Sequence, residues 1–223
     1  MAEQEGVIKF RLDYQVAPAR IEAGFAELNA WRSLLWRLGM IGQDGARYDG
    51  LGYGNLSLRL DAGSFLITGT QTGHIPQLTA AHYACVLQAR PDQNYLSAEG
   101  PLPPSSEALT HAAVYSANPT VCCVAHGHSP GVWRNAVALK LPCVEAGIAY
   151  GTPAMAQAVG ALVESHPGQG VIVMLGHRDG LLTYGQTPEQ ACWLMTRWLA
   201  KALSLADSFE SKGEVGNDSA HSG

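Results

Sequence analysis

The feature that most constrains the fold is a set of short apolar runs, each long enough for one strand. Residues 120–125 (Thr-Val-Cys-Cys-Val-Ala) lie between Pro119 and Gly127, and residues 170–175 form a second such run. Apolar runs of about four to eight residues bounded by turn formers are typical of strands buried on both faces. We therefore expect strands and helices to interleave in one α/β body.

Periodic segments supply the other elements. Apolar residues recur at helical spacing over residues 18–40, and further helices are predicted over 107–117, 130–137, 153–165 and 188–205. Thr152 before Pro153 is a typical helix start. A hairpin is predicted over 56–68, where two strand-like runs flank Asp61-Ala62-Gly63. Residues 143–148 predict a short strand, 78–87 a short helix and strand, and 95–101 an irregular connection.

These elements define one domain at residues 18–206. A chain of 223 residues is long enough for one domain with a sizeable core. Residues 1–17 are expected to form an N-terminal arm. Residues 207–223 are polar and aperiodic, which predicts a disordered tail.

Charge, hydropathy and cysteine usage exclude several classes of protein. The net charge of −5 and the lack of a basic stripe argue against a nucleic-acid partner. The longest apolar runs are strand-sized, so no membrane span is expected. The N-terminus lacks the apolar stretch of a signal peptide, which indicates a cytoplasmic protein. Five cysteines, an odd number with Cys122 and Cys123 adjacent and the others scattered, indicate reduced and mostly buried thiols.

Three histidines suggest a metal site. His126 and His128 follow the run at 120–125, and residues two apart in a strand point to the same side, with Gly127 leaving room between the rings. His177 follows the run at 170–175, so it stands at a strand end. Three histidines with one open position are the ligand set of many catalytic zinc sites. The alternative is that His126 and His128 are hydrogen-bonded turn residues and His177 a surface histidine.

Glu107 and three groups of donors suggest a polar site. Glu107 is predicted to lie in the first turn of a helix, where the helix dipole stabilises a carboxylate. Ser105 and Ser106 before it, Asn55 after Gly54, and the Gly/Thr-rich loop 68–73 offer hydroxyl and N–H donors, which bind anions. Taken singly, each has an ordinary alternative as a helix cap, a tight turn or a loop that ends a strand.

The order of these motifs along residues 18–205 resembles the class II aldolase/adducin family, which includes fuculose-phosphate aldolases. The motifs are Gly54-Asn55-Leu56-Ser57-Leu58-Arg59, Leu66-Ile67-Thr68 with its loop, Pro104-Ser105-Ser106-Glu107 with His111 and Tyr115, His126-Gly127-His128-Ser129, and His177 with Gly180. The resemblance implies an α/β/α sandwich around a largely antiparallel central sheet, and a homotetramer.

The resemblance also implies roles for individual residues. One divalent metal ion per chain, zinc in the first instance, would be bound by His126, His128 and His177, with Glu107 as the acid/base. The phosphate-binding set would be Asn55, Thr72, Gly73, Ser105 and Ser106.

Three departures from the family pattern stand out. Loop 68–73 lacks the usual proline and is one residue longer. Arg178 and Asp179 separate His177 from Gly180, where the family histidine directly precedes glycine. Ala146 stands where bacterial aldolases of the family carry a tyrosine that protonates the leaving group, and Tyr150 lies four residues on.

The sequence therefore predicts a metal-dependent lyase that acts on a small sugar, sugar acid or sugar phosphate through a metal-stabilised enediolate. Aldol cleavage, decarboxylation and dehydration can all use that intermediate. The alternatives are an adducin-like binding or scaffold protein, and an epimerase or a metal-dependent hydrolase on the same site. Because adducin's head domain lacks the metal histidines, their presence here argues against the scaffold.

Overall fold

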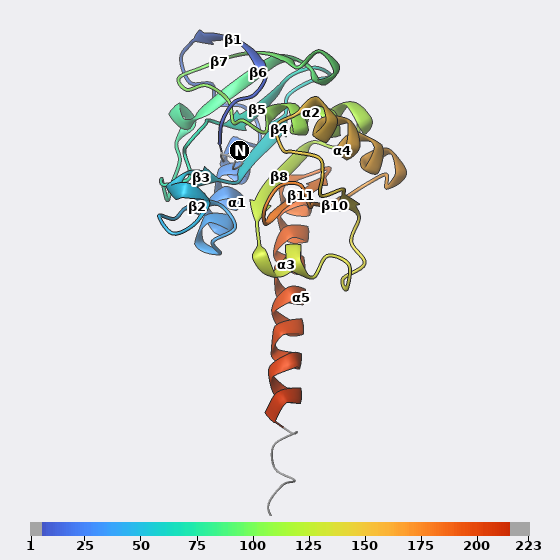
Figure 1. Cartoon of the computed structure of the whole chain (residues 1–223). Coiled ribbons are helices and arrows are strands. Elements are labelled where there is room, and N and C mark those ends of the chain that lie inside the picture. Colours follow the sequence, from blue (N-terminus) through green and yellow to red (C-terminus); the bar gives the residue numbers. More distant parts are fainter. Residues whose placement is uncertain (1–5, 215–223) are drawn as a thin grey trace, which may run out of the picture.

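The structure is a computed structural model that describes residues 6–214, with side chains described through residue 205. A nine-stranded sheet runs through the molecule in the order β1-β7-β6-β5-β4-β8-β11-β10-β9 (Figure 1). Its strands are β1 Arg11–Val16, β4 Asn55–Arg59, β5 Phe65–Thr68, β6 Tyr83–Arg90, β7 Tyr95–Gly100, β8 Cys123–His128, β9 Cys143–Val144, β10 Gly170–Met174 and β11 Gly180–Gly185. The short strands β2 Gly42–Gln43 and β3 Gly52–Tyr53 pair separately.

The helices pack on both faces of this sheet. They are α1 Phe25–Arg37, α2 Ala108–Ala117, α3 Pro130–Arg134, α4 Pro153–Ser165 and α5 Pro188–Glu214, with single 3₁₀ turns at Tyr48–Gly50, Ala80–His82 and Pro91–Gln93. Successive strand residues point to opposite faces. Val124 accordingly packs in the core beneath α2 and α4, and the next residue, Ala125, packs in the core beneath α1, α3 and α5.

The sheet is mixed, so the prediction of a largely antiparallel sheet needs correction. The strands from β7 through β10 in the sheet order pair antiparallel, but both edges are parallel, β1 with β7 and β9 with β10. A parallel pair needs a long crossover connection. Here β1 comes from the predicted arm and β7 from the predicted irregular connection, so sequence inspection omitted both partners. Alternation at Leu12 and Tyr14, and at Leu96 and Ala98, was the available signal.

Other sequence predictions agree with the structure to different degrees. The hairpin is confirmed as β4 and β5, and α4 begins at Pro153 with Thr152 as its N-cap. The first helix begins only at Phe25, after Gly24 with φ 84°, and Ile21 is exposed. All five cysteines are free thiols, and three of them are buried.

The last helix, α5, projects from the body (Figure 1). Its backbone continues to Glu214, past the start of the predicted tail, and residues 215–223 of that tail lie outside the described residues. Among the described residues, no helix combines the length and the apolar character needed to cross a bilayer.

The cap of α4 gives a simple test of the fold. Thr152 Oγ1 accepts from Met155 N at 3.2 Å and donates to Ala149 O at 2.7 Å. We expect Thr152→Ala to lower the free energy of unfolding by about 1 kcal/mol, because helix donors lose their acceptor. Thr152→Ser keeps the hydroxyl and is expected to stay close to the parent protein in urea unfolding. Equal loss in both variants would contradict this capping role.

Candidate metal centre

His126 and His128 project from one face of β8, which lies between β4 and β11 near the middle of the sheet. The predicted strand at 120–125 is shifted, so that both histidines lie inside the strand rather than after it. Gly127 between them faces the opposite side, where an added Cβ would lie 2.8 Å from Met195 Sδ of α5. The glycine is therefore required by the packing of α5 on the sheet. Because position 127 faces away from the histidines, it does not make room between their rings, as the sequence had suggested.

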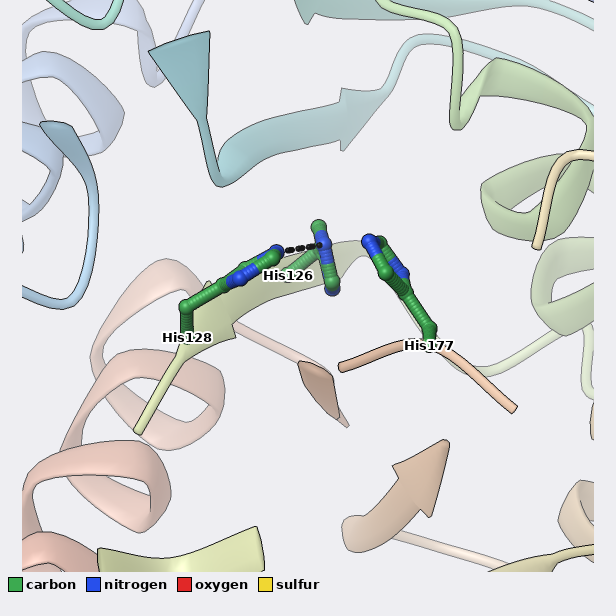
Figure 2. Close-up of side chains that lie close together, drawn as sticks. All are labelled: His126, His128 and His177. Atoms are coloured by element: carbon green, nitrogen blue, oxygen red, sulfur yellow. Dashed lines mark hydrogen bonds between the residues drawn. The ribbon is translucent and has the colours of Figure 1, made fainter. Parts of the chain in front are cut away.

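His177 comes from the turn between β10 and β11. Its backbone N–H donates to Met174 O at 2.9 Å, and its carbonyl accepts from Gly180 N at 2.9 Å, which closes the turn. Because β11 pairs with β8, the turn carries His177 to the two strand histidines. All three side chains are buried, and they lie close together (Figure 2).

The three imidazoles have the spacing of a metal-binding cluster. One ring nitrogen from each residue lies within 4.8 Å of the others. His126 Nε2 and His128 Nε2 are 3.2 Å apart. Two nitrogens that each bind one tetrahedral zinc ion at about 2.0–2.1 Å lie roughly 3.3 Å apart. The spacing of His126 and His128 therefore fits a shared divalent ion, and His177 lies close enough to be considered as a third ligand.

Hydrogen bonding determines which nitrogen of His126 faces the cluster. Leu181 O lies 3.1 Å from His126 Nδ1, and because a carbonyl only accepts, Nδ1 carries the proton and Nε2 keeps its lone pair. Burial, followed by the neighbouring His177, holds the pKa of both His126 and His128 well below the ordinary histidine value. Both rings are neutral at pH 7, which is the form that binds metal.

Glu107 lies beside the cluster. It is the N-cap residue of α2 rather than a first-turn residue, because the helix begins at Ala108, and its side chain makes no capping hydrogen bond to that helix. The carboxylate is buried, and Oε1 lies 4.0 Å from His177 Nδ1. The Glu107 side chain therefore does not cap α2 but lies next to the histidines.

The predicted phosphate-binding residues gather in one pocket. Asn55, Thr72, Gly73, Ser105 and Ser106 line it together with neighbouring loop residues, and none of the described lining residues is charged. We call this the anion pocket. It adjoins the histidines, because Asn55 pairs with His126 across β4 and β8, and Ser106 directly precedes Glu107.

The donors in the anion pocket are partly used within the protein. The hydroxyl of Thr72 donates to Gly69 O at 2.9 Å and closes its own turn. The backbone N–H of Glu107 donates to Ser105 Oγ at 3.3 Å. The Thr72 hydroxyl is therefore already used as a donor, whereas the Ser105 hydroxyl only accepts in this contact and keeps its own proton to donate.

Sequence reasoning missed the aromatic residues around the histidines. Tyr48 and Tyr53 have ring centroids 4.6 Å and 5.2 Å from that of His128. Tyr150, considered only as a replacement for the family tyrosine, is fully buried and stacks on His177 with ring centroids 4.4 Å apart. Tyr48 lies in a single 3₁₀ turn and Tyr53 in the two-residue strand β3, and elements this short have no periodicity that would signal a contact with the site.

The inserted residues Arg178 and Asp179 differ in position. The Arg178 side chain is 78% exposed, whereas that of Asp179 is 7% exposed. Tyr48 Oη donates to Asp179 Oδ2 at 2.8 Å, and Asp179 adopts the left-handed conformation with φ 62°. The insertion therefore adds Asp179 to the wall of the site, where it holds Tyr48 against His128.

A buried polar network lies behind the strand histidines. Ser57 Oγ is 2.7 Å from His111 Nδ1 and 2.7 Å from Tyr115 Oη, which joins β4 to α2. His111 is fully buried, and burial lowers its pKa to about 3. These are the histidine and the tyrosine that follow Glu107 in the motif, and through Ser57 they link α2 to β4.

Comparison with known proteins identifies the family. Residues 44–202 match the family model described as Class II Aldolase and Adducin N-terminal domain. The match covers more than half of the 223 residues, so the chain belongs to the class II aldolase/adducin family. No curated protein sequence matches the chain.

Solved structures share the fold. L-fuculose-1-phosphate aldolase from Thermus thermophilus is 20% identical with a TM-score of 0.64, over 85% of this chain and 95% of that one. A sugar-phosphate aldolase from Thermotoga maritima is 14% identical with a TM-score of 0.57, over 81% and 94%. The N-terminal class II aldolase domain of a Thermoplasma acidophilum protein is 14% identical with a TM-score of 0.57, over 85% and 97%. At these identities the likeness shows the fold alone.

The buried His111 predicts a pH dependence of stability. The folded chain keeps this ring neutral down to a pKa of about 3, whereas the unfolded chain protonates it below its ordinary pKa of 6.5. Stability is therefore lost as the pH falls from 6.5 toward 3, by about 1.4 kcal/mol for each pH unit.

We expect metal-free His111→Gln to lose less stability than the metal-free parent between pH 7.5 and pH 5.5. Urea unfolding at both pH values measures the difference. The variant removes one titrating group and leaves the other histidines in place. Only the contribution of His111 to the change of unfolding free energy with pH is therefore lost. Identical slopes in the two proteins would show that His111 is not held neutral.

Proposed function

We propose that this protein is a divalent-metal-dependent lyase of the class II aldolase type. Its substrate would be a small sugar, sugar acid or sugar phosphate, cleaved, decarboxylated or dehydrated through an enediolate. The observation that carries the proposal is the buried Glu107 carboxylate 4.0 Å from one of three clustered imidazoles.

The metal ligands would be His126, His128 and His177, and zinc is the first candidate because of the three-imidazole donor set. A divalent ion bound there supplies Lewis acidity toward the oxygens of the substrate. The tautomer of His126, held by the Leu181 carbonyl, keeps Nε2 available for such an ion. Tyr150 packs on His177 and Tyr48 packs on His128, and these contacts would limit rotation of the two imidazoles.

Glu107 is the residue proposed to move the proton. Its carboxylate is enclosed by protein at the start of α2, so it holds a defined position next to the ligands. A general base acts only when it is within reach of the proton that it removes. The anion pocket starts one residue away at Ser106, so a phosphate bound there would bring the carbon chain of the substrate past Glu107.

The proposal extends to the organisation of the protein. We propose that residues 18–206 act as a single α/β/α domain in a cytoplasmic homotetramer. The helices on both faces of one sheet and the family membership support this arrangement. The likeness to named sugar-phosphate aldolases supports a carbohydrate substrate.

Replacing Glu107 tests the chemistry. We expect Glu107→Gln to keep its metal and to lose turnover by roughly a hundredfold or more, since it can no longer accept a proton. Turnover would be followed across ketose phosphates and sugar-acid phosphates. Glu189→Gln, at an exposed position in the first turn of α5, is the matched control and is expected to behave as the parent protein.

Equal turnover in Glu107→Gln and the parent protein would remove Glu107 from the mechanism. Hydrolysis of simple esters by the parent protein, without cleavage of any sugar phosphate, would support the hydrolase alternative instead. The first outcome is read from sugar-phosphate turnover in the variant and the second from ester hydrolysis by the parent protein, so one set of assays distinguishes them.

A further inference from the structure

Arg32 is a buried cation that no sequence motif pointed to. It lies on the inner face of α1 and is 1% exposed, although an arginine is seldom buried without a carboxylate partner. Within residues 6–214, its guanidinium donates instead to backbone carbonyls: to Thr72 O at 2.9 Å, to Pro76 O at 3.0 Å and to Ile75 O. Burial lowers its pKa to about 10, so it is charged at neutral pH.

The carbonyls that Arg32 holds belong to the loop that walls the anion pocket. Thr72 and Gly73 line the pocket. A second side chain of α1, Trp36, donates from Nε1 to Gly73 O at 3.0 Å. The carbonyls of Thr72 and Gly73 are thus bonded to α1 by Arg32 and Trp36, while the same two residues line the pocket.

This arrangement directs the backbone N–H of Gly73 away from Arg32 and toward the pocket side of the loop. In a trans peptide, the carbonyl and the following N–H point in opposite directions, and the chain has no cis peptide among its described residues. Because the Thr72 carbonyl points to Arg32, the Gly73 N–H points the other way. No acceptor for that N–H occurs within residues 6–214. Gly73 also has no room for a side chain, since an added Cβ would lie 2.1 Å from Gly42 O.

Charge and dipole act in the same direction here. The guanidinium lies at the carbonyl end of the Thr72–Gly73 peptide, and the pocket lies at its N–H end. Both the cation and the aligned peptide therefore favour a negative charge in the pocket. The described pocket lining holds no charged group, and Arg32 is the cation that contacts the Thr72 carbonyl behind that lining.

We propose that Arg32 is a positioning residue of the anion pocket, which favours a dianionic phosphate monoester over a singly charged anion of the same shape. It acts through the Thr72–Gly73 peptide and does not touch the substrate. The inference rests on the proposed function, in that the pocket is taken as the phosphate end of the substrate site.

Two small anions of similar shape test this role. Methyl phosphate is a dianion at pH 8, since its second pKa is about 6, and methyl sulfate is a monoanion. Isothermal titration of each into the metal-loaded full-length protein gives a ratio of affinities. The metal centre is common to all variants, so its contribution to the ratio cancels between them.

We expect the parent protein to prefer methyl phosphate. Arg32→Gln is expected to reduce that preference by about tenfold, an order-of-magnitude estimate for the loss of one unit charge close to the pocket. Trp36→Phe is the matched control, because it removes a hydrogen bond to the same loop and no charge. It is expected to weaken both anions equally. Arg32→Lys retains the charge and is expected to retain the preference.

Two results would overturn the role of Arg32: an unchanged preference in Arg32→Gln, or an equal loss of preference in Trp36→Phe. If Arg32→Gln does not fold, Arg32→Lys decides, since a lost preference with the charge retained contradicts the proposal. If the metal-loaded parent protein binds neither anion, the anion pocket itself fails, and with it the phosphate end of the proposed function.

Discussion

The pairing of β8 with β11 is the interaction on which the rest of the structure depends. It sets His126 and His128 in register with the strand that begins three residues after His177, so the turn between β10 and β11 closes on the two strand histidines. Pairing of β8 with β4 on the other side adds Asn55 and the anion pocket. Because register in a sheet is all or none, a slip of one residue would turn both β8 histidines to the opposite face.

Burial of so many polar groups needs compensation, and local hydrogen bonds supply part of it. The carbonyl of Leu181 accepts from His126, and Ser57 links His111 to Tyr115. Arg32 donates to three backbone carbonyls. A buried polar group without partners is strongly destabilising, whereas a hydrogen-bonded one is tolerated. These contacts support the proposed cation site at the histidines and the proposed anion pocket beside it.

Sequence reasoning reached the parts of this site that carry a local pattern. The H-x-H spacing, the strand-end His177 and the order of the motifs predicted which residues meet, and α4 was predicted from Thr152 and Pro153. The parallel edges and the residues around the histidines were missed, because they depend on long-range contacts. Arg32 was not singled out, because helical spacing can place it on the inner face of α1 with Leu28 and Leu35 but does not reveal which loop packs above it.

Metal content per chain tests the central claim most directly. Elemental analysis of the purified protein, beside His126→Ala prepared in the same way, measures whether the three imidazoles act as one site. The account predicts about one divalent ion per chain in the parent protein, as for a mononuclear site, and its loss in the variant. A parent protein that holds no metal and takes none up on addition would contradict the account, as would a variant that retains a stoichiometric ion.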